Sequence, residues 1–107
     1  MTGIELSVAA RTDRREITEH TVERFGIAQA RRLRDTFEAA LSRLAESPNL
    51  GRASAELDPP NHSFRYYPVM KSFIIVYEPT DDGIRVARLL HGARNLAIEL
   101  DRDSGED

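Results

Sequence analysis

Residues 72–77 (Ser-Phe-Ile-Ile-Val-Tyr) constrain the fold of this 107-residue chain more than any other stretch. Their apolar side chains are nearly continuous, which is typical of a strand buried on both faces at the centre of a sheet. Such a strand needs hydrogen-bonded neighbours, and the sequence supplies an aromatic segment at 63–68 and an apolar one at 84–90. Residues 79–83 (Pro-Thr-Asp-Asp-Gly) have the composition of a turn, so we expect them to join the last two strands into a β-hairpin.

The last strand alternates apolar and polar residues, and this alternation predicts which side chains share a face. One face carries Ile84, Val86, Arg88 and Leu90, and the other carries Arg85, Ala87, Leu89 and His91. In this register Arg88 and His91 point to opposite sides of the sheet. They could form a joint site only if a β-bulge intervened.

Two helices are expected before these strands. The first is predicted to begin with Thr12 or Asp13 as its cap and to end at about Phe25, followed by Gly26 in a conformation that favours glycine. Its buried arc is predicted to contain Ile17, Thr18, Thr21, Val22 and Phe25.

The second helix has the clearer pattern and should run over about residues 27–46. Proline at position 48 disfavours a helical conformation at Ser47 and ends the helix there. Apolar residues recur at spacings of three and four and predict one buried stripe: Ala30, Leu33, Phe37, Ala40, Leu41 and Leu44.

A short alternating segment at 4–8 predicts one further strand before the helices. The expected order is therefore β-α-α-β-β-β, with a loop over 52–61. This order predicts an α+β fold in which an N-terminal helical hairpin packs on a small, mainly antiparallel sheet. We expect one domain over residues 1–98 and an acidic, mobile tail over 99–107.

The charge distribution limits the classes of partner. The chain has a formal net charge of −3, but the tail carries five acidic residues against Arg102, a net of −4, which leaves +1 for residues 1–98. A near-neutral body predicts weak or indirect binding to nucleic acid. Because the chain has no cysteine and no apolar run long enough for a membrane span or a signal peptide, we expect a cytoplasmic protein without a membrane contact.

Several short motifs, taken in order, resemble the RelE/ParE superfamily of toxins from type II toxin–antitoxin systems, and the ParE branch in particular. The likeness covers residues 4–96, almost the whole domain. The residues that carry it are Ala9-Ala10-Arg11, Phe25-Gly26, Ala30, Leu41, Leu44, Pro48-Asn-Leu-Gly-Arg52, Arg65, Phe73-Ile-Ile-Val-Tyr77 and Leu90-His-Gly-Ala-Arg94-Asn95.

The resemblance implies a small toxin that is neutralised by a ParD-like antitoxin, whose C-terminal segment wraps the helical hairpin and the sheet. ParE toxins act on DNA gyrase and stabilise a cleaved DNA complex, whereas RelE toxins cut mRNA in the ribosomal A site. One fold serves both outcomes, so the fold cannot choose between them. A third possibility is a relic that still pairs with its antitoxin but is no longer toxic.

The resemblance to gyrase poisons implies no catalytic residues and no cofactor, and we see no constellation of metal ligands. If the chain were instead a nuclease, the candidate groups for proton transfer and phosphate stabilisation would be Arg65, His91 and Arg94. Acids rather than an aromatic residue follow the last strand, which disfavours this alternative.

Contacts with a protein partner are the other expectation. Arginine and aromatic side chains on the second helix and on the sheet could meet acidic and apolar residues of an antitoxin. The candidate partner-binding residues are Arg31, Arg34, Phe37, Arg65, Tyr67, Arg88 and Arg94. For Arg65 and Arg94, pairing inside the protein is an equally good interpretation, and His91 could simply satisfy a local hydrogen bond.

Overall fold

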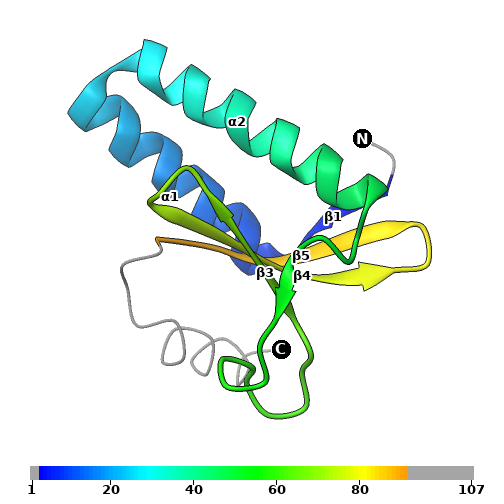
Figure 1. Cartoon of the computed structure of the whole chain (residues 1–107). Coiled ribbons are helices and arrows are strands. Elements are labelled where there is room, and N and C mark those ends of the chain that lie inside the picture. The colour runs from blue at the N-terminus through cyan, green and yellow to red at the C-terminus, as the bar shows by residue number, and fades with distance from the viewer. Residues whose placement is uncertain (1–2, 92–107) are drawn as a thin grey trace.

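The computed structural model describes residues 3–91, and it confirms the predicted α+β class (Figure 1). A two-residue strand, β2, is added to the expected order. The elements are β1 Ile4–Leu6, α1 Val8–Phe25, α2 Ile27–Glu46, β2 Arg52–Ala53, β3 Arg65–Val69, β4 Phe73–Thr80 and β5 Gly83–His91. The predicted acidic tail and Arg94 lie outside the described residues.

The five strands form one sheet in the order β1-β5-β4-β3-β2. β1 pairs with β5 in parallel, and every other pairing is antiparallel, so the prediction of a mainly antiparallel sheet is confirmed. β4 is central, and three consecutive residues, Ile75, Val76 and Tyr77, are fully buried. A strand with both faces covered produces this pattern, as predicted for residues 72–77.

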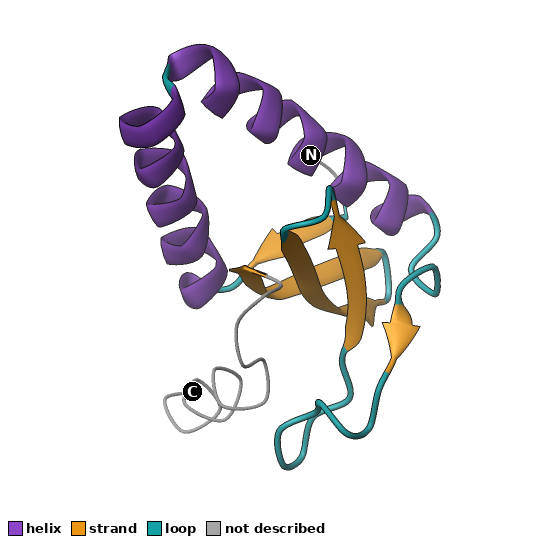
Figure 2. Ribbon diagram, turned by 60° about the vertical axis from the view of Figure 1, so that its left-hand side comes forward, coloured by secondary structure: helices purple, strands orange, loops and turns teal. Residues whose placement is uncertain are grey.

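Helix α2 confirms the sequence-based prediction. It spans Ile27–Glu46 and is capped at its end by Ser47. Within the predicted stripe Ala40 is half-buried and the others are buried: Ala30, Leu33, Phe37, Leu41 and Leu44. Leu33, Phe37, Leu41 and Leu44 pack with buried residues of the sheet, and both helices lie on this one side of it (Figures 1 and 2).

Helix α1 begins five or six residues earlier than the sequence predicted. Its cap is Ser7, not Thr12 or Asp13. The Ser7 hydroxyl oxygen accepts a hydrogen bond from the Ala10 N–H at 3.0 Å, and the hydroxyl donates to the Ala87 carbonyl at 2.7 Å. One side chain therefore caps the helix and ties its start to β5.

The predicted buried arc of α1 is wrong at three of its five positions, because Thr18, Val22 and Phe25 are exposed. Thr21 is buried, but Val22 is 39% and Phe25 67% exposed. Ile27, the first residue of α2, is 60% exposed, so the bend of the hairpin projects beyond the sheet that would cover it. Gly26 joins the helices with a φ of 91°, which confirms the need for glycine there.

The predicted faces of β5 are also wrong, because the strand contains a β-bulge. Val76 pairs with Arg88 and the next residue, Tyr77, pairs with Val86, so Ala87 is the extra residue. The alternation therefore reverses beyond Val86: Leu89 joins Ile84 and Val86 on the helix side, and Leu90 packs on the opposite face.

The connection between β4 and β5 is shorter than predicted. Pro79 pairs with Ile84 and Thr80 with Gly83, so only Asp81 and Asp82 remain in the turn. Pro79 therefore lies within β4 rather than in a loop.

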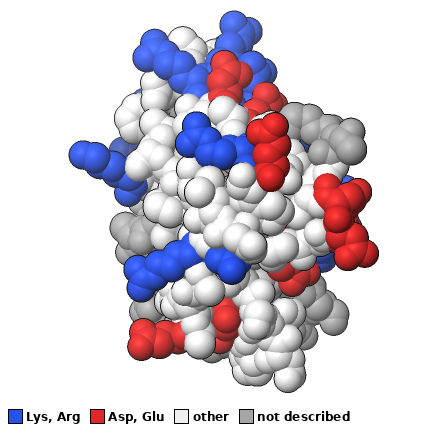
Figure 3. Space-filling model, turned by 45° about the vertical axis from the view of Figure 1, so that its right-hand side comes forward, with Lys and Arg blue, Asp and Glu red and all other residues white. Residues whose placement is uncertain are grey.

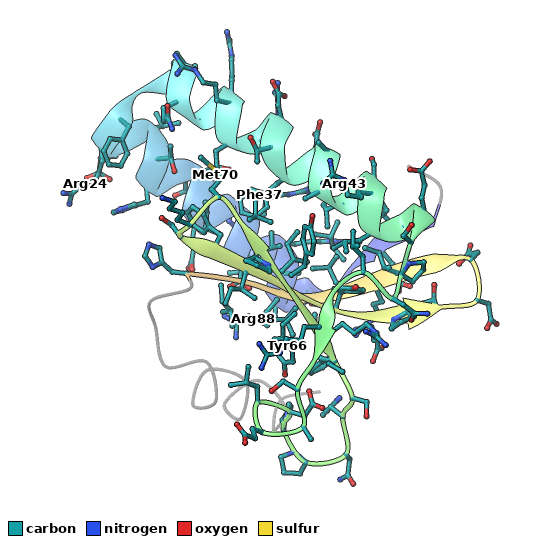
Figure 4. The ribbon with its side chains drawn as sticks, in the orientation of Figure 1. Arg24, Phe37, Arg43, Tyr66, Met70 and Arg88 are labelled. Atoms are coloured by element: carbon teal, nitrogen blue, oxygen red, sulfur yellow. The ribbon has the colours of Figure 1, made fainter. Side chains whose placement is uncertain are left out.

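The face of the sheet away from the helices has a small core of its own. Tyr66 packs there with Phe64, Val76 and Leu90, whereas its neighbour Tyr67 packs on the helix side. The Tyr66 hydroxyl donates a hydrogen bond to Asp58 Oδ1 at 2.8 Å. Figure 4 shows Tyr66 and Phe37 on opposite sides of the sheet.

Tyr66 gives the stability of the fold an expected dependence on pH. Burial, and then the hydrogen bond and charge of Asp58, raise the pKa of the Tyr66 hydroxyl from its usual 10.0. Tyrosine in the unfolded chain loses its proton at about pH 10, but folded Tyr66 keeps it, so rising pH favours unfolding. The contribution should be complete below about pH 10 and decline above it.

Urea midpoints measured on both sides of the tyrosine pKa would check this expectation. The Tyr66→Phe variant should lose less stability than the wild type on the alkaline side. Tyr67→Phe, which removes a tyrosine hydroxyl beside Arg43 on the other face of the sheet, is the matched control for the loss of one hydroxyl. Equal losses in the wild type and Tyr66→Phe would contradict the assignment.

Candidate functional site

Arg65 and Tyr77 hold the turn after α2 on the end of the sheet. Arg65 Nη1 donates to the carbonyls of Gly51 at 2.6 Å and Asn49 at 3.2 Å. The Tyr77 hydroxyl donates to the Pro48 carbonyl at 2.6 Å and accepts from the Gly51 N–H at 2.8 Å. A Cβ at Gly51 would lie 2.6 Å from the Tyr77 oxygen, so only glycine fits. Burial raises the pKa of the Tyr77 hydroxyl, which keeps the proton that it donates.

Arg88 forms a nearly buried ion pair with Asp13 of α1. Arg88 Nε lies 2.6 Å from Asp13 Oδ2 and Nη2 lies 2.9 Å from Oδ1. The same carboxylate accepts the Leu89 N–H at 2.9 Å. β1 pairs with β5 only as far as Val86. Beyond that point the edge of β5 has no neighbouring strand, and Asp13 accepts the Leu89 N–H in place of one. The guanidinium of this candidate partner-binding residue is thus engaged within the protein.

His91 and Arg65, two of the candidate nuclease residues, lie far apart. His91 is exposed, pairs with Phe73, and packs against its ring at a centroid distance of 5.4 Å. Arg65 pairs with Tyr77 from the other side of β4. The partners of His91 and Arg65 on β4, Phe73 and Tyr77, are four residues apart, about 13 Å at the usual rise of a strand. Hence the structure does not bring Arg65 and His91 together.

The candidate residues on α2 divide into surface and core. Arg31 and Arg34 are exposed, and Arg34 pairs with Asp35 at 3.1 Å. Phe37 is 5% exposed and meets Phe73 edge-on at 5.5 Å. Figure 3 shows basic side chains at the top, in the middle and in the lower part of one face of the molecule.

A groove of about 420 Å³ lies between α2 and β3, and we call it the α2–β3 groove. Tyr67 and Val69 line it from the strand, and Ala39 and Ala40 from the helix. Arg43 lines it too, with its Nη1 3.4 Å from the Tyr67 hydroxyl. Tyr67 therefore has an apolar ring in the groove and a polar tip at its rim.

A larger cavity of about 580 Å³ opens between α1, α2 and β5, and we call it the interhelical cleft. Figure 2 shows the two helices diverging from their bend towards the sheet. The apolar lining consists of Ile17, Ala30, Leu33, Phe37, Leu41 and Leu89. The charged lining consists of Arg11, Arg14, Arg15, Arg34, Glu19 and Glu38.

Asp13 and Tyr77 are the residues whose roles the sequence analysis missed. For Asp13 a signal existed: it lies four residues before Ile17 and eight before Thr21, on the side of α1 that faces the protein. For Tyr77 the strand pattern predicted burial but not the partner of its hydroxyl, because that partner is a loop 26 residues earlier in the chain.

None of the helices described between residues 3 and 91 has the length and apolar character needed to cross a membrane. Over the same residues, no group of three or more His, Cys, Asp or Glu side chains is arranged to hold a metal ion.

The architecture is that of a small α+β domain with a helical hairpin on one face of a mainly antiparallel sheet. Its arginines are dispersed along the helices and the sheet. The sequence matches the ParE toxin of type II toxin–antitoxin system, parDE, over residues 4–96. The chain therefore belongs to the ParE toxin family.

A solved structure supports the fold independently. A chain of a chromosomal ParDE toxin–antitoxin system from P. aeruginosa superposes with a TM-score of 0.64 at 17% sequence identity. The match covers 85% of this chain and 96% of that chain. The comparison with curated proteins gave no significant match.

Proposed function

We propose that this toxin is held inactive by a ParD-like antitoxin and, when released, acts in the cytoplasm by poisoning DNA gyrase. It would need no cofactor and would perform no chemistry of its own. We prefer this function to RNA cleavage because Arg65 is separated from His91. Arg65 is also bound to two loop carbonyls, so it supports the fold of the turn after α2. General acid–base catalysis requires its groups around one reacting point.

The proposed antitoxin contact is the α2–β3 groove together with the adjoining surface of α2. Tyr67 offers an aromatic ring, and Arg43 lies at the rim beside it. Arg31 and Arg34 are exposed cations on the same helix, and Arg34 lies on its flank towards the interhelical cleft. A partner segment with apolar residues for the groove and acidic residues for the arginines fits this surface.

DNA supercoiling by purified gyrase tests the proposed target. Adding the folded toxin should reduce supercoiling and trap double-strand breaks, and adding the cognate antitoxin should reverse both effects. An antitoxin from an unrelated system is the matched control and should reverse neither. Normal supercoiling in a large excess of folded toxin would rule out gyrase as the target.

A translation extract tests the nuclease alternative, in which Arg65, His91 and Arg94 would act on mRNA. Cuts at defined positions in ribosome-bound mRNA, lost in a His91→Ala variant, would favour that alternative. Harmless overexpression without antitoxin would favour the non-toxic relic.

A further inference from the structure

We propose that the acidic segment 96–107 of this chain occupies the interhelical cleft. The contact would be intramolecular and would cover the arginines along the mouth of the cleft. It does not depend on whether gyrase or the ribosome is the target. Three observations carry the inference: the chemistry of the cleft, the sequence of the segment and the point at which the chain leaves the cleft.

The cleft combines a buried apolar floor with a basic rim. Leu33, Phe37 and Leu89, each no more than 6% exposed, form part of the floor. The rim has four exposed arginines against two glutamates, a net of +2. About 580 Å³ lies within the usual range for a site that encloses a ligand. The occupant should therefore be apolar on one side and acidic on the other.

The segment has this composition. Leu96, Ile98 and Leu100 alternate with other residues, and four of the chain's acidic residues follow Glu99 within eight positions. Residues 99–107 have a net charge of −4. Its apolar side chains match the floor, and its carboxylates match the arginine guanidinium groups of the rim, for which charge-assisted hydrogen bonds are available.

The chain leaves the described structure at the border of the cleft. Leu89 lines the cleft, and His91, two residues later, packs on Phe73. Phe73 in turn packs on Phe37 of the floor. Five further residues lead from His91 to Leu96, and they can span up to about 17 Å. So short a tether gives the segment an effective concentration in the millimolar range.

The whole chain offers a clean experiment because it contains no cysteine. A Ser104→Cys variant can carry a single spin label, whose relaxation effect on backbone amides is read by NMR. The signals of residues 11–19 and 30–41 should broaden. A label on an Asp81→Cys variant should broaden residues 14–19 and 30–37 far less, since Leu89 of the floor pairs with Ile75, which lies five residues along β4 from Thr80 beside the turn, about 17 Å away.

A pair of substitutions on α1 tests the charge pairing. Arg14→Glu, in the lining of the cleft, should remove most of the broadening caused by the label at position 104. Arg24→Glu is the matched control, since Arg24 is exposed at the bend of the hairpin and points away from the cleft (Figure 4). It should leave the broadening unchanged.

Three results would overturn the proposal. The first is sharp signals throughout the cleft with the label at position 104. The second is equal broadening over the whole surface, or equal losses in the two arginine variants. The third uses a mixture of isotope-labelled chain and spin-labelled, isotope-free chain: broadening of the cleft in that mixture would mean that a second copy is the occupant.

Discussion

Replacing Asp13 with asparagine is expected to lower the free energy of unfolding by about 3–5 kcal/mol, the usual cost of breaking a buried ion pair. The side chains of Asp13 and Arg88 are only 10% and 12% exposed, so water compensates the arginine poorly once the carboxylate is gone. The Leu89 N–H also loses its charged acceptor. Urea denaturation of the full chain, with midpoint and slope both fitted, gives the change directly.

An exposed ion pair provides the matched control. Asp35→Asn breaks the pair with Arg34, whose two side chains are 67% and 58% exposed, and should change stability by less than about 1 kcal/mol. Replacing both buried partners, Asp13→Leu with Arg88→Met, should recover much of the loss because no charge is then left buried. Equal losses in Asp13→Asn and Asp35→Asn would contradict the structural role.

Replacing Tyr77 with phenylalanine should cost about 1–3 kcal/mol, the penalty for leaving a buried polar group without its partner. The ring still fills its place in the core, but the Gly51 N–H and the Pro48 carbonyl lose the hydroxyl that joins them. The loss should be local as well as global. Hydrogen exchange at the Gly51 amide should become faster by more than at the amides of central β4.

Tyr67→Phe is the control for this substitution. It removes a hydroxyl 3.4 Å from Arg43 at the surface and should change stability by no more than about 0.5 kcal/mol. If Tyr77→Phe left both the unfolding midpoint and the Gly51 exchange rate unchanged, the hydroxyl would not be holding the turn.

The elements that were predictable are those in which one spacing rule acts over many residues. The stripe on α2 repeats over about four turns, so a local error at one residue does not change the prediction. The continuous apolar run of β4 likewise predicted a central strand. In both, burial in the tertiary structure and local pattern agree, and the sequence therefore identifies the element, and for α2 also its bounds.

The errors arose where a single long-range contact decides the conformation. Ser7 became the cap of α1 because the Ala87 carbonyl, 80 residues later, accepts its hydroxyl. One extra residue, Ala87, reversed the faces of the rest of β5. Neither a distant acceptor nor a bulge leaves a periodic trace in the sequence.

The candidate site was harder to predict than the fold. The sequence singled out arginines by residue type, but it could not tell an arginine that faces a partner from one that supports the fold. Arg65 binds loop carbonyls and Arg88 binds Asp13, whereas Arg31 is exposed. That distinction depends on contacts between elements, and the role of the exposed arginines stays a prediction.

The two edges of the sheet have a consequence for the behaviour of the protein in concentrated solution. An open strand edge is a template on which another molecule can add its own strand and begin a fibre. Here β1 covers three residues of β5, and Asp13 takes the Leu89 N–H beyond them. At the other edge, β2 pairs with the first two residues of β3. Pro68, which has no N–H to donate, lies in the part of β3 that β2 does not cover. Growth of the sheet from one molecule to the next is therefore disfavoured at both edges.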